Sequence, residues 1–256
     1  MFQYANQPQS ISRVLDNGIR LCLSSFKSVV GIAFVSAVIS NLPNLFTPTP
    51  QAGQAFAPGE LQPFLGVMLV TMLMSFVFYN AIILRIDASA SDRDISLGTS
   101  LLTGLKKLLP VLAGVILYML AVMLGSILLL IPGIILMISL FFYSMLIVVD
   151  NRGIIDSLKT SHHLVWGNWW RTMTVFMVPA ALMMVIYIAL GFVTGVATSM
   201  AGSVEQSAGM PVTVTLLSIA VGTIGGPLFY AIMLAQLHDL KLRKQGLDLE
   251  QRLAAG

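Results

Sequence analysis

Side chains that commonly perform chemistry are few in this sequence. Its three histidines are His162, His163 and His238. Adjacent residues of a helix point about 100° apart, so His162 and His163 are poorly placed to bind one metal ion, and no carboxylate or cysteine spacing near them is typical of a zinc site. The sequence also has no glycine-rich nucleotide loop and no serine nucleophile elbow. We therefore predict no catalytic residue, no metal site and no cofactor.

The polar groups within the uncharged stretches limit the transport chemistry that the chain can support. Proton-driven or sodium-driven transporters usually keep an ionisable group inside the membrane. Here the corresponding groups are hydroxyls and one amide, at Asn80, Tyr118, Ser126, Ser139, Tyr143, Ser144 and Tyr187. Backbone carbonyls and neighbouring helices can satisfy such groups, and we expect a structural role for Asn80. The single cysteine, Cys22, excludes an internal disulfide framework.

Composition places these residues in a membrane protein. Of the 256 residues, 57% are hydrophobic and only 10% are charged, whereas soluble domains carry about 25% charged residues. Uncharged stretches long enough to span a bilayer occur at residues 28–43, 63–84, 109–131, 134–149, 172–196 and 212–237. We therefore predict an all-α polytopic membrane protein with six transmembrane helices, folded as one integral membrane domain over residues 1–256.

The stretch that organises the predicted fold has no charged residue between Leu108 and Val149. A single helix of that length would reach roughly 60 Å, about twice the thickness of the hydrocarbon core. The interruption is expected at Pro132 and Gly133, because proline lacks an N–H and glycine can adopt positive φ. The sequence thus predicts a tight hairpin whose turn, at these two residues, lies at the outer surface of the membrane.

The distribution of basic residues predicts the orientation. All 14 Lys and Arg residues precede the first span, follow the last, or fall between the second and third spans or between the fourth and fifth. The opposite loops carry only Glu60 and Glu205. By the positive-inside rule, we expect both termini in the cytoplasm. The pI of about 9.1 then attracts anionic lipid headgroups. It does not indicate a nucleic-acid partner, because the charges are dispersed over the chain.

Three amphipathic segments precede alternate spans. The first follows Ser10, an expected N-cap, the second begins near Asp94 and the third follows Gly153. Each has apolar residues at helical spacing, as in interfacial helices that lie on a membrane surface; for the first segment, packing on the protein itself is the alternative. We interpret the recurring order of surface helix, outward span and return span as a degenerate threefold repeat. The predicted units are residues 10–62, the second span 63–84, then 94–149, 153–237 and a cytoplasmic tail, 238–256.

Certain residues are expected to hold these elements together. Asp150 should stand at the N-terminus of the third surface helix or pair with Arg85 or Arg171, and thereby fix the angle between that helix and the fourth span. Small residues at one-turn spacing in the last two spans can bring helix backbones together, although glycine is common in membrane helices without such a role. The predicted structural residues are Pro132, Gly133, Asp150, Gly153, Trp166, Asn168, Arg171, Gly191, Gly195, Gly222 and Gly226.

The region from Pro132 to Arg171 resembles a known family. The residues that carry the resemblance are Pro132-Gly133-Ile134-Ile135, Val149-Asp150, Gly153-Ile154, Ser157, Ser161, Leu164-Val165-Trp166-Gly167-Asn168 and Arg171. They are similar to the signature of YciC-type bacterial inner-membrane proteins, a family of unassigned function. More distantly, the region is similar to the membrane part of some glycerophosphodiester phosphodiesterases, and no counterpart of their catalytic domain is found in the sequence. The resemblance implies an inner-membrane location and a role in envelope or lipid homeostasis.

Two hypotheses of function are open at this point. The first is a non-enzymatic bacterial inner-membrane protein that organises lipid or a partner protein in envelope homeostasis. The alternative is a passive carrier or flippase for an apolar or lipid-like substrate, whose path could be lined by Ser, Tyr and Met. The expected partners are membrane lipid and a membrane protein or a second copy of the chain. A lateral groove between spans that holds ordered lipid would distinguish the two.

The predicted orientation can be tested with a reporter fusion. Alkaline phosphatase joined after Gly256 should be inactive, because the enzyme needs an oxidising compartment for its disulfides and the C-terminus is expected in the cytoplasm. A cytoplasmic reporter, green fluorescent protein, at the same position should be active. Phosphatase activity from the fusion at Gly256 would contradict the predicted orientation.

Overall fold

The computed structural model describes residues 3–46, 59–201 and 212–255, so the predicted loop residue Glu205 lies outside the described part of the chain. These ranges contain helices and no β-strand. The helices are α1 (Ile11–Phe46), α2 (Leu61–Ala90), α3 (Leu97–Lys106), α4 (Leu108–Leu128), α5 (Leu130–Leu140), α6 (Tyr143–Val149), α7 (Ile154–Val165), α8 (Trp169–Ala201) and α9 (Val212–Ala255). Within the described ranges, six helical segments are long and apolar enough to cross a membrane. The prediction of an all-α, multi-pass membrane protein is confirmed.

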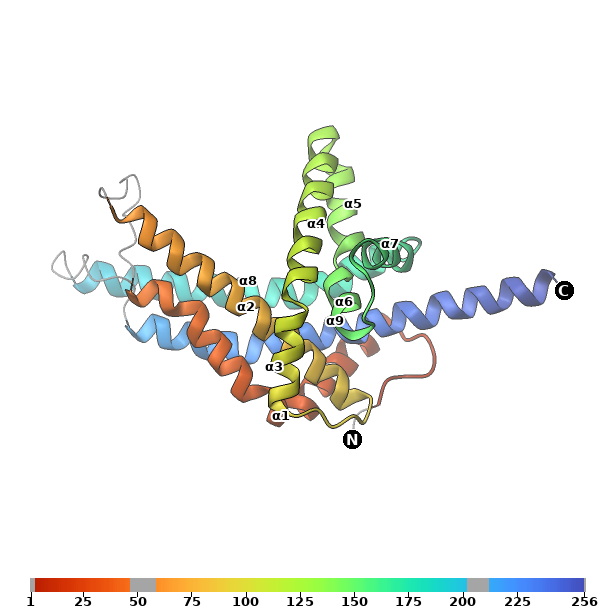
Figure 1. The fold of residues 1–256 in the computed structure, drawn as a ribbon, viewed down its shortest axis with the longest axis horizontal. Coiled ribbons are helices and arrows are strands. Elements are labelled where there is room, and N and C mark those ends of the chain that lie inside the picture. Colours follow the sequence, from red (N-terminus) through yellow and green to blue (C-terminus); the bar gives the residue numbers. More distant parts are fainter. Residues whose placement is uncertain (1–2, 47–58, 202–211, 256) are drawn as a thin grey trace.

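The helices form two groups that diverge from a common junction (Figure 1). Helix α1 packs along α9 and α2, and α8 packs along α9. Helices α4 and α5 form a separate hairpin that points away from α8 and α9 at a wide angle. Helix α9 continues past the junction and carries the C-terminus away from the rest of the molecule. The two groups therefore share a core only at the junction.

This core is built around α6. All residues of α6 from Tyr143 to Val148 are buried. Side chains of α2 and α9 complete the same cluster, and Ile83, Ile86 and Leu240 among them are fully buried. The tip of the hairpin is the opposite case, since it is apolar and its side chains are mostly exposed. Acyl chains are as apolar as leucine, so a bilayer can surround this tip without the cost that water would impose.

The hairpin turns at Leu129, earlier in the chain than the sequence predicts. Helix α4 ends at Leu128, Leu129 is extended with φ −163° and ψ 146°, and α5 begins at Leu130. Pro132 consequently lies in the first turn of α5. There its missing N–H costs no intrahelical hydrogen bond, and its fixed φ suits a helix. The prediction of a break at Pro132 and Gly133 is therefore wrong.

Gly133 serves close helix packing and not a turn. A Cβ built on Gly133 would collide with the hydroxyl of Ser126 on α4 and would lie 2.9 Å from the Cα of Ser126. A Cβ on Gly125 would lie 3.2 Å from the Cα of Gly133. The two glycines let the backbones of α4 and α5 approach closely, as small residues do in membrane helix pairs. Gly133 is buried, and the location of the hairpin turn at the outer surface of the membrane stays a prediction.

The return leg of the hairpin consists of α5 and α6, which are separated by a turn at Phe141 and Phe142. The hydroxyl of Ser161, on α7, donates to the carbonyl of Ser139 at 2.7 Å and accepts the N–H of Phe142 at 3.1 Å. Phe142 and Ser161 are both fully buried. Within a membrane, irregular backbone must be buried in protein and its N–H and C=O groups must have hydrogen-bond partners. Helix α7 is thereby joined to the return leg.

The first predicted surface segment is continuous with α1 and packs on the protein. Its apolar residues Val14 and Leu21 are fully buried. A Cβ built on Gly18 would lie 2.5 Å from the Cα of Ile232, so glycine is needed where α1 crosses α9. This segment therefore follows the alternative considered for it, contact with its own protein.

Helices α3 and α7 expose more of their apolar residues. Both bury small polar residues, such as Ser100 and Ser157, and expose apolar ones, such as Leu102 and Ile155, while α7 also buries Leu164 and Val165. Outward-facing apolar side chains of this kind suit a lipid surface. The interfacial location of α3 and α7 and the threefold repeat stay predictions.

Candidate functional site

A groove of about 690 Å³ lies between α1, α8 and α9, in the apolar part of these helices. Small residues on two of its walls provide the space. On α1 they follow helical spacing, at Ala33, Ser36, Ala37 and Ser40, and on α9 they are Ser218, Gly222, Gly225 and Gly226. A leucine at any of these positions would fill the space between the helices, whereas these small side chains leave it open.

The glycines of α9 combine two roles. A Cβ built on Gly222 would lie 3.3 Å from the Cβ of Ala37, so Gly222 permits close packing of α9 on α1. A Cβ on Gly226 would meet only the ring of Tyr230, at 3.8 Å, so Gly226 mainly leaves space in the groove. On α8, a Cβ at Gly191 or Gly195 would meet nothing within 4 Å. Close helix packing at a predicted small residue is therefore seen at Gly222, and the structural roles predicted for Gly191 and Gly195 stay predictions.

The groove offers hydroxyl and amide groups on a mostly apolar wall. Its polar lining residues in the described part of the chain are Ser36, Ser40, Asn41, Tyr187, Ser218 and Tyr230, and these include no carboxylate, lysine, arginine or histidine. Part of this polarity is already satisfied, because the Asn41 amide donates to the carbonyl of Ala37 at 2.8 Å and the Ser40 hydroxyl lies 3.1 Å from that of Ser75. Such a wall suits a neutral, largely apolar molecule with a few polar groups.

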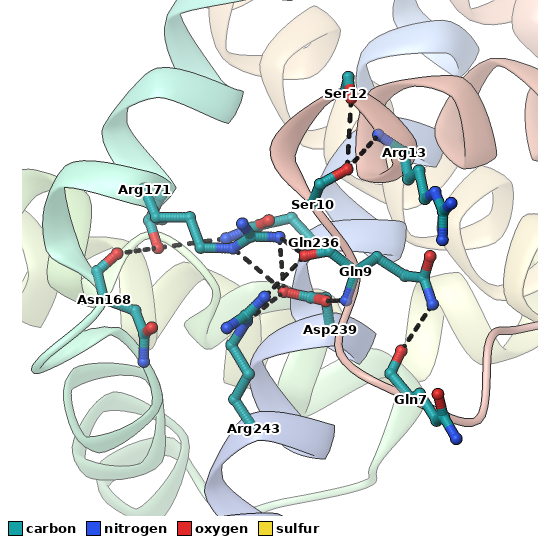
Figure 2. Close-up of polar contacts among 11 residues, drawn as sticks. Gln7, Gln9, Ser10, Ser12, Arg13, Asn168, Arg171, Gln236, Asp239 and Arg243 are labelled. Atoms are coloured by element: carbon teal, nitrogen blue, oxygen red, sulfur yellow. Dashed lines mark hydrogen bonds and ion pairs between the residues drawn. The ribbon is translucent and has the colours of Figure 1, made fainter.

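Away from the groove, α1, α8 and α9 are tied together by the carboxylate of Asp239, which lies within α9 and is 3% exposed (Figure 2). Its Oδ1 accepts the N–H of Gln9 at 2.6 Å. Its Oδ2 accepts hydrogen bonds from Arg171 Nη2 at 2.9 Å and Arg243 Nε at 2.8 Å. Both guanidinium groups also donate to the carbonyl of Gln9, each at 2.6 Å. A buried charge needs this degree of pairing to be retained.

Further contacts hold the N-terminal segment, residues 3–10, against α2 and α9. Tyr4 stacks on His238 with ring centroids 4.3 Å apart and donates to Asp87 on α2 at 3.2 Å. Burial, and next the neighbouring Asp87 carboxylate, raise the pKa of the Tyr4 hydroxyl well above its usual value, so the group remains a neutral donor. Ser10 then accepts the N–H of Arg13, at 3.4 Å, as the expected N-cap of α1.

The sequence matches one known protein family. Residues 70–240 match a family described as a domain of unknown function, DUF7847. The chain belongs to this family. The matched region includes the α4–α5 hairpin, α7, α8 and the part of α9 that carries Asp239. No curated protein and no solved structure matches the chain.

Two residues of this DUF7847 domain that the sequence singled out take part in the network or its support. Arg171 is a central member, and the carbonyl of Asn168 accepts both the N–H and the hydroxyl of Thr172 at the start of α8. Thr172 in turn accepts a hydrogen bond from the buried amide of Gln236 at 3.3 Å. The partners Gln9, Asp239 and Arg243 were not predicted. Their contacts join residues far apart in the sequence, and local spacing carries no signal for such pairs.

Asp150 has a different partner from those expected. It follows α6 as the C-cap residue, and its carboxylate pairs with Lys241 of α9 at 2.7 Å. Arg85 instead donates to backbone carbonyls of Ser28 and Ile95, and Arg171 pairs with Asp239. The proposed pairs of Asp150 with Arg85 and Arg171 are therefore wrong. Asp150 still links the return leg to another helix, but that helix is α9.

Two further predicted residues, Gly153 and Trp166, lie at the two ends of α7, and Asn80 lies on α2. Gly153 is the extended N-cap residue of α7, and a Cβ there would meet nothing within 4 Å. Trp166 is the C-cap residue of α7 and is 59% exposed, with His162 close to its ring. Asn80 donates to the carbonyl of Gly104 at 3.2 Å, where α3 approaches α2 so closely that a Cβ on Gly104 would lie 2.5 Å from the carbonyl oxygen of Val77.

The Asp239 network should be a major source of stability. Asp239→Asn would leave Arg171 and Arg243 facing an amide in a largely buried site, and we expect a loss of about 3 kcal/mol in the free energy of unfolding. Thermal unfolding in detergent measures this loss, and limited proteolysis should show faster cleavage between residues 3 and 10.

The matched control is Asp16→Asn, which breaks an exposed i,i+4 pair with Arg20. Exposed pairs contribute about 0 to 1 kcal/mol, so the control should unfold close to the wild-type temperature. Equal unfolding temperatures for the Asp239 and Asp16 variants would contradict the role assigned to the network.

Proposed function

We propose that this protein is a non-enzymatic, lipid-binding protein of a bacterial inner membrane, in which the groove between α1, α8 and α9 holds the apolar part of a membrane lipid. The observation that carries the proposal is the groove itself. It lies in the apolar part of three membrane-spanning helices, and the described residues that line it supply hydroxyls and no charged group. In a bilayer, phospholipids and other amphiphiles are present at high local concentration next to such a groove.

The length of the groove favours lipid binding over transport across the membrane. In the described part of the chain, its lining residues on α1 run from Ala33 to Asn41 and those on α9 from Ser218 to Tyr230. At about 1.5 Å per residue these segments cover roughly 12 and 18 Å, about half of the 30 Å hydrocarbon core. A carrier or flippase needs a path through the full core. The passive-carrier hypothesis therefore receives less support than a protein that retains or organises lipid.

The lining also supports a non-enzymatic role. Hydrolysis of a lipid ester by a serine nucleophile requires a base within hydrogen-bond reach of the hydroxyl. The hydroxyls of the groove are those of serines and tyrosines, and the described lining residues include no histidine or carboxylate that could act as this base. The groove is therefore better suited to binding than to catalysis.

The orientation completes the proposal. The basic ends of α1, α2, α8 and α9 are placed in the cytoplasm, with both termini, and α3 and α7 lie at the inner leaflet with their apolar residues toward lipid. The groove is then nearer the outer leaflet. A role in envelope or lipid homeostasis agrees with the resemblance to YciC-type proteins, which stays a hypothesis.

Filling the groove should reduce lipid retention. Gly226→Leu adds a side chain at a position where a Cβ has space, so we expect it to displace about two methylene groups of a bound chain. At about 0.8 kcal/mol per methylene, affinity should fall roughly tenfold. Native mass spectrometry of the protein purified in a mild detergent counts the lipids that remain bound.

Gly191→Leu is the matched control, because it makes the same change at a position of α8 where a Cβ would meet nothing within 4 Å, and Gly191 itself does not line the groove. Ser218→Leu fills the groove from another point and serves as a second variant if Gly226→Leu does not fold. Retention of lipid by a folded groove variant, at the level of the Gly191 control, would contradict the proposal.

A further inference from the structure

A second cavity, of about 540 Å³, lies where α7 meets the basic end of α9. Asp150 and Arg152 line it from the segment before α7, and α7 and α9 supply the other walls. The polar lining residues on these helices are Thr160, His163, Lys241, Lys244 and Gln245. We call it the basic cavity, because three cationic side chains and one carboxylate line it.

The charges of the basic cavity are only partly paired with one another. Lys241 pairs with Asp150 at 2.7 Å. Arg152 contacts Asp156 at 2.9 Å and the hydroxyl of Thr160 at 3.0 Å, and lies 3.9 Å from Asp150. Lys244 donates to the neutral carbonyl of Trp166 at 2.9 Å. Among the side chains that the structure describes, Lys241 and Arg152 contact carboxylates, whereas the ammonium group of Lys244 contacts a neutral carbonyl and can attract a further anion.

The tryptophans place this cavity at the depth of lipid headgroups. Trp166 follows α7 directly, and its carbonyl is the acceptor of Lys244. The side chains of Trp166 and Trp170 are 59% and 77% exposed, and Ile155 on α7 is 62% exposed. Exposed indole rings beside exposed aliphatic side chains are typical of the boundary between headgroups and acyl chains. A lipid at this boundary can place its phosphate in the cavity and its chains along the apolar surface.

We infer that the basic cavity binds the phosphate group of an anionic membrane lipid. Lysine and arginine are the usual donors to phosphate oxygens, and the Thr160 hydroxyl adds a neutral donor. Basic pockets between helices at the cytoplasmic side of a membrane are typical sites for anionic headgroups. A zwitterionic lipid fits less well, because its own cation would approach Lys244 and Arg152. The inference goes beyond the proposed groove, since the two cavities share no lining residue.

Lys244→Gln tests the inference with little disturbance of the cavity, because the pair of Asp150 with Lys241 remains. Native mass spectrometry with phosphatidylglycerol or phosphatidylcholine of identical acyl chains gives the two dissociation constants. The wild-type protein should prefer phosphatidylglycerol. The substitution should lower this preference about fivefold, the usual effect of one lysine near an anionic headgroup. Lys244→Arg keeps the charge and should keep the preference.

Lys27→Gln is the matched control, because Lys27 is exposed on α1 and the net charge changes equally. Equal losses of preference for the Lys27 and Lys244 variants, or an equal loss for Lys244→Arg, would overturn the inference in favour of diffuse surface charge. Displacement of phosphatidylglycerol by excess inorganic phosphate would overturn it in favour of a soluble anion. Gly226→Leu should retain the headgroup preference, which separates failure of this site from failure of the groove.

Discussion

The carboxylate of Asp239 accepts hydrogen bonds from the N-terminal segment, from α8 and from its own helix, and the positions of α1, α8 and α9 depend on this contact. Arg171 and Arg243 compensate the cost of burying a negative charge, and both donate to the backbone of Gln9 as well. The contact lies next to the buried core around α6 and Leu240. The N-terminal ends of α1 and α8 are thus joined to one part of α9 by this contact.

Beyond this contact, the size of the side chains between α1, α8 and α9 decides whether the helices pack closely or separate. At Gly18 and Gly222, glycine allows α1 to lie against α9. Where Ser36, Gly226 and Tyr187 line the space between three helices, the side chains do not fill it, and the groove results. Empty apolar space in a protein is unfavourable unless something occupies it. In a bilayer the available occupant is lipid, which is the physical basis of the proposed function.

The sequence predicts the spans well because a bilayer imposes a strict length of uncharged helix, and the six uncharged stretches satisfy it. It predicts Pro132 poorly because proline is compatible with the first turn of a helix, so the residue type alone does not place the hairpin turn. The partners of Asp150 and Arg171 could not be predicted, since Lys241 and Asp239 lie 91 and 68 residues further along the chain. The groove depends on side-chain volumes across three helices, which no local pattern records.

Photolabelling in a native-like membrane tests the central claim most directly. A phospholipid with a diazirine at mid-chain, reconstituted with the protein and activated by light, labels residues that contact the chain, and peptide mass spectrometry locates them. We predict labelling concentrated on Ala33 to Asn41 of α1 and Ser218 to Tyr230 of α9, and weaker labelling of α4, whose apolar side chains are highly exposed. Labelling that follows exposed area alone, and is strongest on α4, would contradict a lipid-binding groove.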